Sequence, residues 1–127
     1  MPFTHAIEGS LIHFRWSGVL TREGFQSLGE AMPGLVRQVW QSTGRMPHVL
    51  HDFRATEGCD FPPLTAYEIS LRRRTVPIPE PVKSAVVATP TGGWAMARVF
   101  QALNRNDNLV MELFETEEAA RAWLGSE

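Results

Sequence analysis

The chain has 127 residues, of which 43% are hydrophobic and 20% charged, so its size and composition are those of one folded globular domain, residues 1–127. The formal net charge of −2 argues against a nucleic-acid partner, because nucleic-acid-binding domains normally carry a strong basic bias. A single cysteine, no apolar run near the roughly 20 residues that span a bilayer, and no secretory signal pattern lead us to expect a cytoplasmic protein without disulfides.

The first predicted elements are two strands joined by a tight turn. Glu8-Gly9-Ser10 is a turn signal between the runs Thr4 to Ile7 and Leu11 to Trp16. In the second run apolar residues alternate with His13 and Arg15, which predicts a strand with one buried face and one face in solvent. An antiparallel hairpin is therefore expected to open the fold.

A long helix is predicted next. Gly18 is expected to end the second strand, and Thr21 offers an N-cap oxygen for a helix whose apolar spacing continues to Trp40. Pro33-Gly34 interrupts this spacing, so we expect a kink or a restart of the helix there.

Strands and helices alternate over the remainder of the chain. The predicted elements are a strand at 49–53, a helix from Pro62-Pro63 to the arginines at 72–74, a strand at 84–89, a helix from Gly92-Gly93 to Leu103, a strand at 109–114 and a last helix capped by Thr116. The order ββαβαβαβα predicts an α/β fold, with a mixed, mostly parallel sheet of four to five strands, an opening hairpin and four helices.

Short motifs along the chain follow one another in the order of a known superfamily. They are Trp16-Ser17-Gly18 with Thr21, Asp52-Phe53-Arg54 with Glu57-Gly58, Arg72-Arg73, Met96-Ala97-Arg98 with Phe100, and Glu118-Ala119 with Ala122-Trp123-Leu124. Together with the order of elements they resemble the SpoIIAA-like branch of the STAS superfamily, over almost the whole sequence. The resemblance implies a STAS-like fold and a non-enzymatic regulatory or binding module.

The best-known members of this superfamily, the bacterial anti-anti-sigma factors, are switched by phosphorylation of a serine that follows an aspartate. The resemblance places Asp52 and Asp60 on two aspartates of that pattern and Phe61 on the serine. Phenylalanine has no hydroxyl group, so phosphoryl transfer at this position is chemically excluded, and the nearby hydroxyls of Thr56 and Thr65 are displaced from it. What the resemblance leaves is a protein–protein regulatory module without the usual phosphoserine.

Other members of the branch resemble lipid carriers of the CRAL-TRIO type, which implies a small hydrophobic ligand or a membrane surface, and this is the leading hypothesis. The candidate ligand-binding residues are Phe61, Leu64, Tyr67 and Leu71. The arginines that follow them, Arg72, Arg73 and Arg74, can contact anionic lipid and would make the protein peripheral to the membrane. The alternative is that the apolar residues belong to the core and that the arginines complement the helix dipole.

Polar residues and glycines at two strand ends are candidates for contact with a partner or an anion. They are Asp52, Arg54, Thr56 and Asp60 on a loop after the strand at 49–53, and Gly92 and Gly93 at the start of a helix. A Gly-Gly helix start can expose backbone N–H groups, although it lacks the spacing of dinucleotide or P-loop sites and is more often a turn and cap. An enzyme would have to use Asp52, Arg54, Glu57 and Asp60, but no nucleophile with a base and no cofactor fingerprint accompanies them. Asp52 is otherwise expected to bond to the backbone of its own loop, with Arg54 and Glu57 as a surface pair.

The histidines do not predict a metal site, and we expect no cofactor. His48 and His51 lie three positions apart on one strand, so their side chains should point to opposite faces. His5 and His13 can lie on neighbouring strands, but no cysteine or carboxylate cluster is expected beside them. A homodimer through Trp40, Trp94 or the opening strand is a further alternative.

Overall fold

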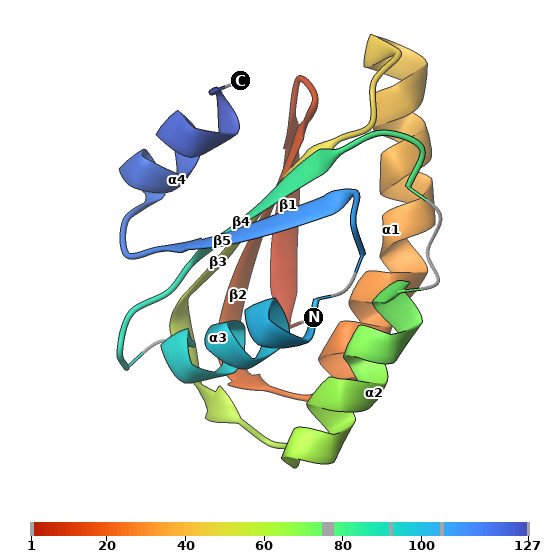
Figure 1. The fold of residues 1–127 in the computed structure, drawn as a ribbon. Helices are drawn as coiled ribbons and strands as arrows, with labels where there is room; N and C mark the ends of the chain where they lie inside the picture. The colour runs from red at the N-terminus through yellow and green to blue at the C-terminus, as the bar shows by residue number, and fades with distance from the viewer. Residues whose placement is uncertain (1, 75–77, 92, 105, 127) are drawn as a thin grey trace.

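A five-stranded mixed β-sheet forms the centre of the structure (Figure 1). The structure, a computed structural model, describes residues 2–74, 78–91, 93–104 and 106–126, without the side chains of Pro63, Arg73 and Arg74. The elements are β1 (Phe3–Glu8), β2 (Leu11–Leu20), α1 (Arg22–Thr43), β3 (His48–Cys59), α2 (Pro63–Arg74), β4 (Val82–Val87), α3 (Trp94–Leu103), β5 (Leu109–Phe114) and α4 (Glu117–Leu124). Strand order is β1-β2-β3-β4-β5, with β1 antiparallel to β2 and the other neighbours parallel. The predicted order, opening hairpin and mostly parallel sheet are confirmed.

The second strand is longer than predicted. β2 continues through Gly18 to Leu20, so the expectation that Gly18 ends the strand is wrong. The register against β3 shifts between Gly18 and Val19, and Gly18 has a φ of 72°. Glycine adopts this positive φ without steric cost. The extra residue of the bulge is Glu57 on β3, after which Val19 pairs with Gly58.

The third strand is extended by the same pairing. β3 runs six residues past the predicted end at Phe53, because Ala55, Thr56 and Cys59 pair with the continuation of β2. The predicted loop that carries Asp52, Arg54 and Thr56 is therefore a strand.

The first helix is continuous across its proline. The Thr21 Oγ1 atom accepts a hydrogen bond from the Gly24 N–H at 3.0 Å, which confirms the predicted N-cap. Gly44, with a φ of 71°, ends the helix and donates its N–H to the Trp40 carbonyl at 2.8 Å. Pro33 lies inside the helix, so the restart predicted there does not occur.

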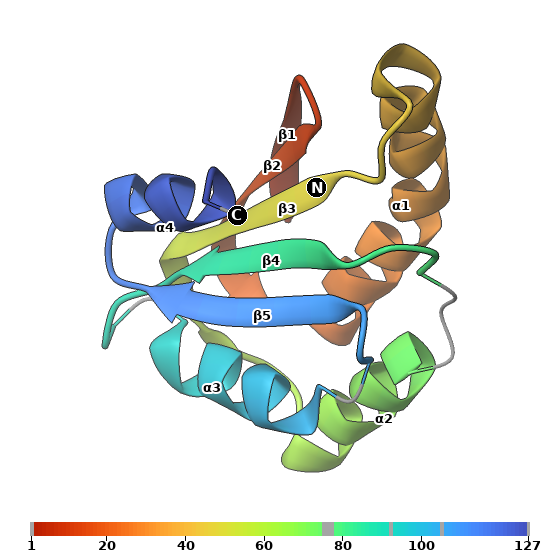
Figure 2. The same cartoon turned by 45° about the horizontal axis from the view of Figure 1, so that its top comes forward.

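The two faces of the sheet are covered by different helices. Helices α1, α2 and α3 pack on one face over an aromatic core, in which Trp16 lies 5.1 Å from Phe25 and 5.4 Å from Phe53, ring centre to ring centre. Helix α4 covers the opposite face (Figure 2). There Ala120 packs against an apolar strip made by Leu50, Ala85 and Val87, all fully buried.

The position of α4 corrects the prediction for β2. Arg15 is exposed as expected, but His13 is only 3% exposed, because α4 covers the part of the sheet where solvent was predicted.

Within the described ranges, no helix is long and apolar enough to cross a bilayer.

Candidate functional site

Helix α2 packs on the domain mainly with small and polar residues, beside the partly buried Ile69, and turns three other apolar residues outward. Its buried residues are Thr65, Ala66 and Ser70. Leu64, Tyr67 and Leu71 are 64%, 42% and 37% exposed, and their spacing of three and four positions places them on one face. We call these three residues the α2 outer face. The alternative that they belong to the core is wrong, because all three side chains are exposed.

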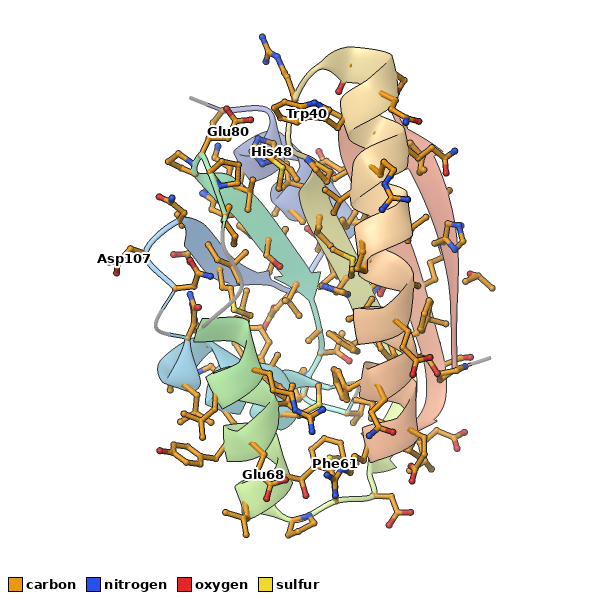
Figure 3. The ribbon with its side chains drawn as sticks, turned by 90° about the vertical axis from the view of Figure 1, so that its right-hand side faces the viewer. Trp40, His48, Phe61, Glu68, Glu80 and Asp107 are labelled. Atoms are coloured by element: carbon orange, nitrogen blue, oxygen red, sulfur yellow. The ribbon has the colours of Figure 1, made fainter. Side chains whose placement is uncertain are left out.

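Phe61 is separated from the α2 outer face. Its ring packs edge-on against Phe25 of α1, with the ring centres 5.8 Å apart, and Figure 3 shows it between the start of α2 and the adjoining end of α1. Phe61 is half-buried against the main core. The four predicted ligand-binding residues therefore do not line one site: one is joined to the core and three face outward.

Two cavities among the described residues are lined by elements other than α2. The first, about 20 Å³, lies between α1, α3 and the sheet and is about large enough for one water molecule. The second, about 210 Å³, is an open groove between Leu11 and His48 of the sheet and Arg121 and Leu124 of α4. These cavities provide no pocket beneath α2 for the predicted hydrophobic ligand.

The charged residues of α2 lie beside its outer face. Arg72 is exposed, and the side chains of Arg73 and Arg74 lie outside the described residues. Glu68 is paired with Arg22 of α1, their Oε2 and Nη2 atoms 3.8 Å apart, and both side chains are about half exposed. This pair links α2 to α1 and is worth little on its own, because solvent screens it.

Asp52 and Arg54 form a tight ion pair on the face of the sheet that α4 covers. Asp52 Oδ1 accepts hydrogen bonds from the backbone N–H and the Nε–H of Arg54, both at 3.0 Å, and Oδ2 accepts one from Nη2 at 2.8 Å. The predicted bond from Asp52 to nearby backbone is confirmed. The predicted pairing of Arg54 with Glu57 is not observed, since Arg54 instead reaches Glu117 Oε1 of α4 at 3.5 Å.

Thr56 and Asp60 do not join this pair. Thr56 is 4% exposed and donates its hydroxyl to the Phe53 carbonyl at 2.6 Å, so it is committed within the fold. Asp60 is exposed, and its backbone N–H donates to the Leu20 carbonyl at 2.8 Å. The predicted contact residues on β3 and directly after it therefore divide among the α4 side, the core and the surface.

Gly93 has a packing role at the start of α3. It has a φ of 85°, and a Cβ atom there would lie 2.7 Å from Phe53 Cβ and 3.3 Å from Thr56 Oγ1. Only glycine combines this backbone conformation with such a close approach. Gly92, its predicted partner in anion contact, lies outside the described residues.

A cluster that the sequence did not predict forms where α4 meets the sheet. One ligand-type atom from each of His13, Asp52 and Glu117 lies within 4.8 Å of the others. The expectation of no carboxylates beside His13 is wrong, because the last helix folds back over β2. Two carboxylates and an imidazole suit a divalent cation, but Asp52 and Glu117 are already paired with Arg54 and Arg121. We therefore interpret the cluster as a balanced ion-pair network.

The pKa values in this network follow its hydrogen bonds. Burial would raise the pKa of Asp52, but the hydrogen bonds and charge of Arg54 outweigh it and hold this pKa below its ordinary value. The hydrogen bond from Arg121 lowers the pKa of Glu117. Both carboxylates therefore stay ionised in the folded protein at neutral pH.

His48 and His51 point to opposite faces, as predicted. His48 Nδ1 accepts a hydrogen bond from the Lys83 backbone N–H at 2.8 Å, and its side chain lines the groove beside α4. His51 Nδ1 accepts one from Trp16 Nε1 at 3.0 Å in the core under α1 and α3. The two rings serve the packing of two different faces.

Comparisons with known proteins identify the fold. No family model and no curated protein matches the sequence. Among solved structures, an uncharacterised protein of the DUF3478 family with a SpoIIAA-like fold, from Shewanella loihica PV-4, is similar with a TM-score of 0.60 and 13% identity, over 96% of this chain and 91% of that one. The anti-sigma factor antagonist SpoIIAA in its unphosphorylated form is similar with a TM-score of 0.57 and 16% identity, over 98% of this chain and 99% of that one. The predicted STAS-type, SpoIIAA-like fold is confirmed.

Proposed function

We propose that this protein is a non-enzymatic regulatory module that binds a protein partner through the α2 outer face. The observation that carries the proposal is the orientation of α2, which exposes Leu64, Tyr67 and Leu71 while burying Thr65 and Ser70. A helix normally buries its apolar side in its own domain. An exposed apolar face on a folded domain is typical of an interaction site.

The size and chemistry of this face suit a protein interface. The exposed portions of the three side chains add up to more than one fully exposed side chain, so covering them contributes roughly 2–4 kcal/mol. Tyrosine and arginine are enriched in the residues that dominate protein–protein binding energies; Tyr67 belongs to this face, and the exposed Arg72 follows Leu71 in the sequence. Glu68 and Arg22 supply a polar rim.

The fold supports the same proposal. One protein with this fold is described as an antagonist of an anti-sigma factor, which is a function exerted on another protein. In the present chain Phe61 packs against Phe25, and the nearby hydroxyl residues Thr56 and Thr65 are 4% and 7% exposed. We therefore propose regulation by binding alone, without a phosphoserine at Phe61.

Pull-down from the native host, followed by calorimetry with the purified partner, tests the proposal. The double substitution Leu64→Ser with Tyr67→Ser is expected to weaken binding by at least tenfold. Trp40→Ser is the matched control, since Trp40 is 48% exposed but lies on α1 at the end of the molecule away from Glu68 of α2 (Figure 3). Equal binding by the wild type and the α2 double variant would refute this surface.

A second candidate, an anionic membrane surface, is favoured by the position of Arg72 at the end of the same helix, followed in the sequence by Arg73 and Arg74. A helix with an apolar face and cationic residues can lie on anionic lipid. Flotation with phosphatidylserine-containing vesicles and with neutral vesicles separates this candidate from a protein partner. Binding to the anionic vesicles that is lost in the Leu64→Ser, Tyr67→Ser variant would favour the membrane.

Two other occupants of the α2 outer face can be tested with the same protein preparation. Native mass spectrometry after mild purification would show a small hydrophobic ligand as an added mass. Sedimentation velocity would show self-association, which is the homodimer alternative. Either result, if it disappears in the α2 double variant, would replace the partner protein as the occupant of the α2 outer face.

A further inference from the structure

His13 is buried between the sheet and α4 with its two ring nitrogens in different surroundings. The side chain belongs to a residue that is 3% exposed, and Nδ1 lies 3.3 Å from Arg121 Nη2 and 3.9 Å from Glu8 Oε2. A guanidinium group can only donate, so Nδ1 must be the acceptor and the neutral ring carries its proton on Nε2. Nε2 is buried and has no hydrogen-bond partner among the described residues.

Every element packed around His13 contributes charged groups. They are Glu8 on β1, Arg15 on β2, Asp52 and Arg54 on β3, and Glu117 and Arg121 on α4. Arg121 pairs with Glu8 at 3.0 Å and with Glu117 at 2.8 Å. The acidic and basic groups named here are equal in number, so a neutral His13 leaves the cluster without net charge and a second proton unbalances it.

Helix α4 depends on these contacts to stay on the sheet. It has eight residues, a length at which an isolated helix has little stability in water. Its apolar attachment is Ala120, with Trp123 and Leu124 beside it. Its polar attachments run through Arg121 to Glu8 and His13, and through Glu117 to Arg54. At its end, the Trp123 carbonyl also accepts a hydrogen bond from Lys83 Nζ of β4 at 2.7 Å.

We propose that His13 is a pH-sensitive latch, which holds α4 on the sheet while its ring is neutral and loosens α4 when a proton from solvent adds to Nδ1. In the protonated ring, Nδ1–H faces the N–H groups of Arg121 across 3.3 Å, so two positively charged donors oppose each other. Glu8 is the nearest acceptor for the new proton, and it is already bonded to Arg121. Repulsion between the two cations turns the Arg121 side chain away from the ring, which weakens bonds that hold α4 on the sheet.

The consequence of release is a newly exposed apolar surface. The strip under Ala120, made by Leu50, Ala85 and Val87, is fully buried while α4 is docked. Loosening of α4 exposes this strip on the face of the sheet opposite α2. The latch is therefore independent of the α2 outer face and of the function proposed for it.

The direction of the pH dependence follows from the surroundings of the ring. Burial first, and then the charge of Arg15, lowers the pKa of His13 below its ordinary value of 6.5. The released state takes up the proton more readily than the docked state, so docking is complete above about pH 6.5 and weakens as pH falls below it. Asp52 and Glu117 have lowered pKa values and lose their charge only at more acidic pH. Burial also lowers the pKa of His48, which makes His48 the necessary control.

Nuclear magnetic resonance of the ¹⁵N-labelled protein between pH 8 and pH 5 tests the latch. We expect the backbone amides of residues 117–124 to exchange with solvent several-fold, and at most about tenfold, faster at pH 5.5 than at pH 7.5, after correction for intrinsic rates, while α1 amides stay protected. His13→Asn keeps an acceptor near the position of Nδ1 and does not titrate, so it should abolish this dependence. His48→Asn should retain it.

Three results would overturn the latch. The first is titration of the His13 ring in the wild type without any change in the α4 amides, a result that needs no variant to fold. The second is an unchanged pH dependence in His13→Asn. The third is a loss of protection throughout the domain with the same midpoint, which would show unfolding of the whole protein. Arg121→Gln gives a separate check, because removal of the opposing cation should raise the pKa of His13 and shift its ring titration to higher pH.

Discussion

Substitution of Gly93 by alanine should destabilise the protein for two separable reasons. The residue has a φ of 85°, a conformation that costs an alanine about 1–2 kcal/mol. The new Cβ would also lie 2.7 Å from Phe53 Cβ, well inside ordinary van der Waals contact, and 3.3 Å from the buried Thr56 hydroxyl. Forcing a methyl group into a packed core costs a further 1–3 kcal/mol, roughly. We therefore expect Gly93→Ala to lower the free energy of unfolding by about 2–5 kcal/mol.

Gly9→Ala separates the two contributions. Gly9 has a φ of 61°, but a Cβ atom there would meet nothing within 4 Å. It should lose only the conformational part, about 1–2 kcal/mol. Urea unfolding followed by far-UV circular dichroism gives both losses from the transition midpoints at a common slope. Equal losses for the two variants would refute the close approach of α3 to Phe53 and would reopen an anion-binding role for Gly93.

Three further substitutions, with Leu28→Ala as a control, examine the ion pair, the end of α4 and the α2 outer face. Asp52→Asn should cost about 1–3 kcal/mol in urea unfolding at neutral pH because it weakens the bonds from Arg54. In the wild type, ionised Asp52 stabilises the fold above pH 3.8, and this contribution is lost as pH falls through the lower pKa that Asp52 has in the folded protein. Asp52→Asn should remove this part of the pH dependence, which urea titrations between pH 5 and pH 3 would measure. Lys83→Met removes the bonds that Lys83 Nζ donates to carbonyls at the end of α4, so hydrogen exchange should become several-fold faster in α4 and stay unchanged in α1. Leu64→Ser should change the free energy of unfolding by less than about 0.5 kcal/mol, because Leu64 is exposed. Leu28→Ala, at a residue that is only 6% exposed, should lower it by about 2–5 kcal/mol. A large loss for Leu64→Ser would contradict the outward position of Leu64.

The candidate surface was identified in the sequence, but its orientation was not. Leu64, Tyr67 and Leu71 have the spacing of one helix face whether that face is buried or exposed. The choice depends on what the opposite side of the helix offers to the domain. Here Ala66 and Ser70 are small enough for close packing, and both are buried. A periodicity shows which residues lie together, whereas the neighbours decide which side faces inward.

The sequence by itself determined the order of elements, the opening hairpin, the cap at Thr21 and the STAS-type fold, because periodicity, caps and turns depend on residues a few positions apart. The tertiary structure alone decided the length of β3, whose residues after Phe53 form a strand because β2 continues to Leu20 and pairs with them. It also decided the surroundings of His13, which depend on a helix from the far end of the chain. Strand extension and helix docking both require partners that are distant in the sequence. A local pattern of residues does not show which distant segment will cover a given residue.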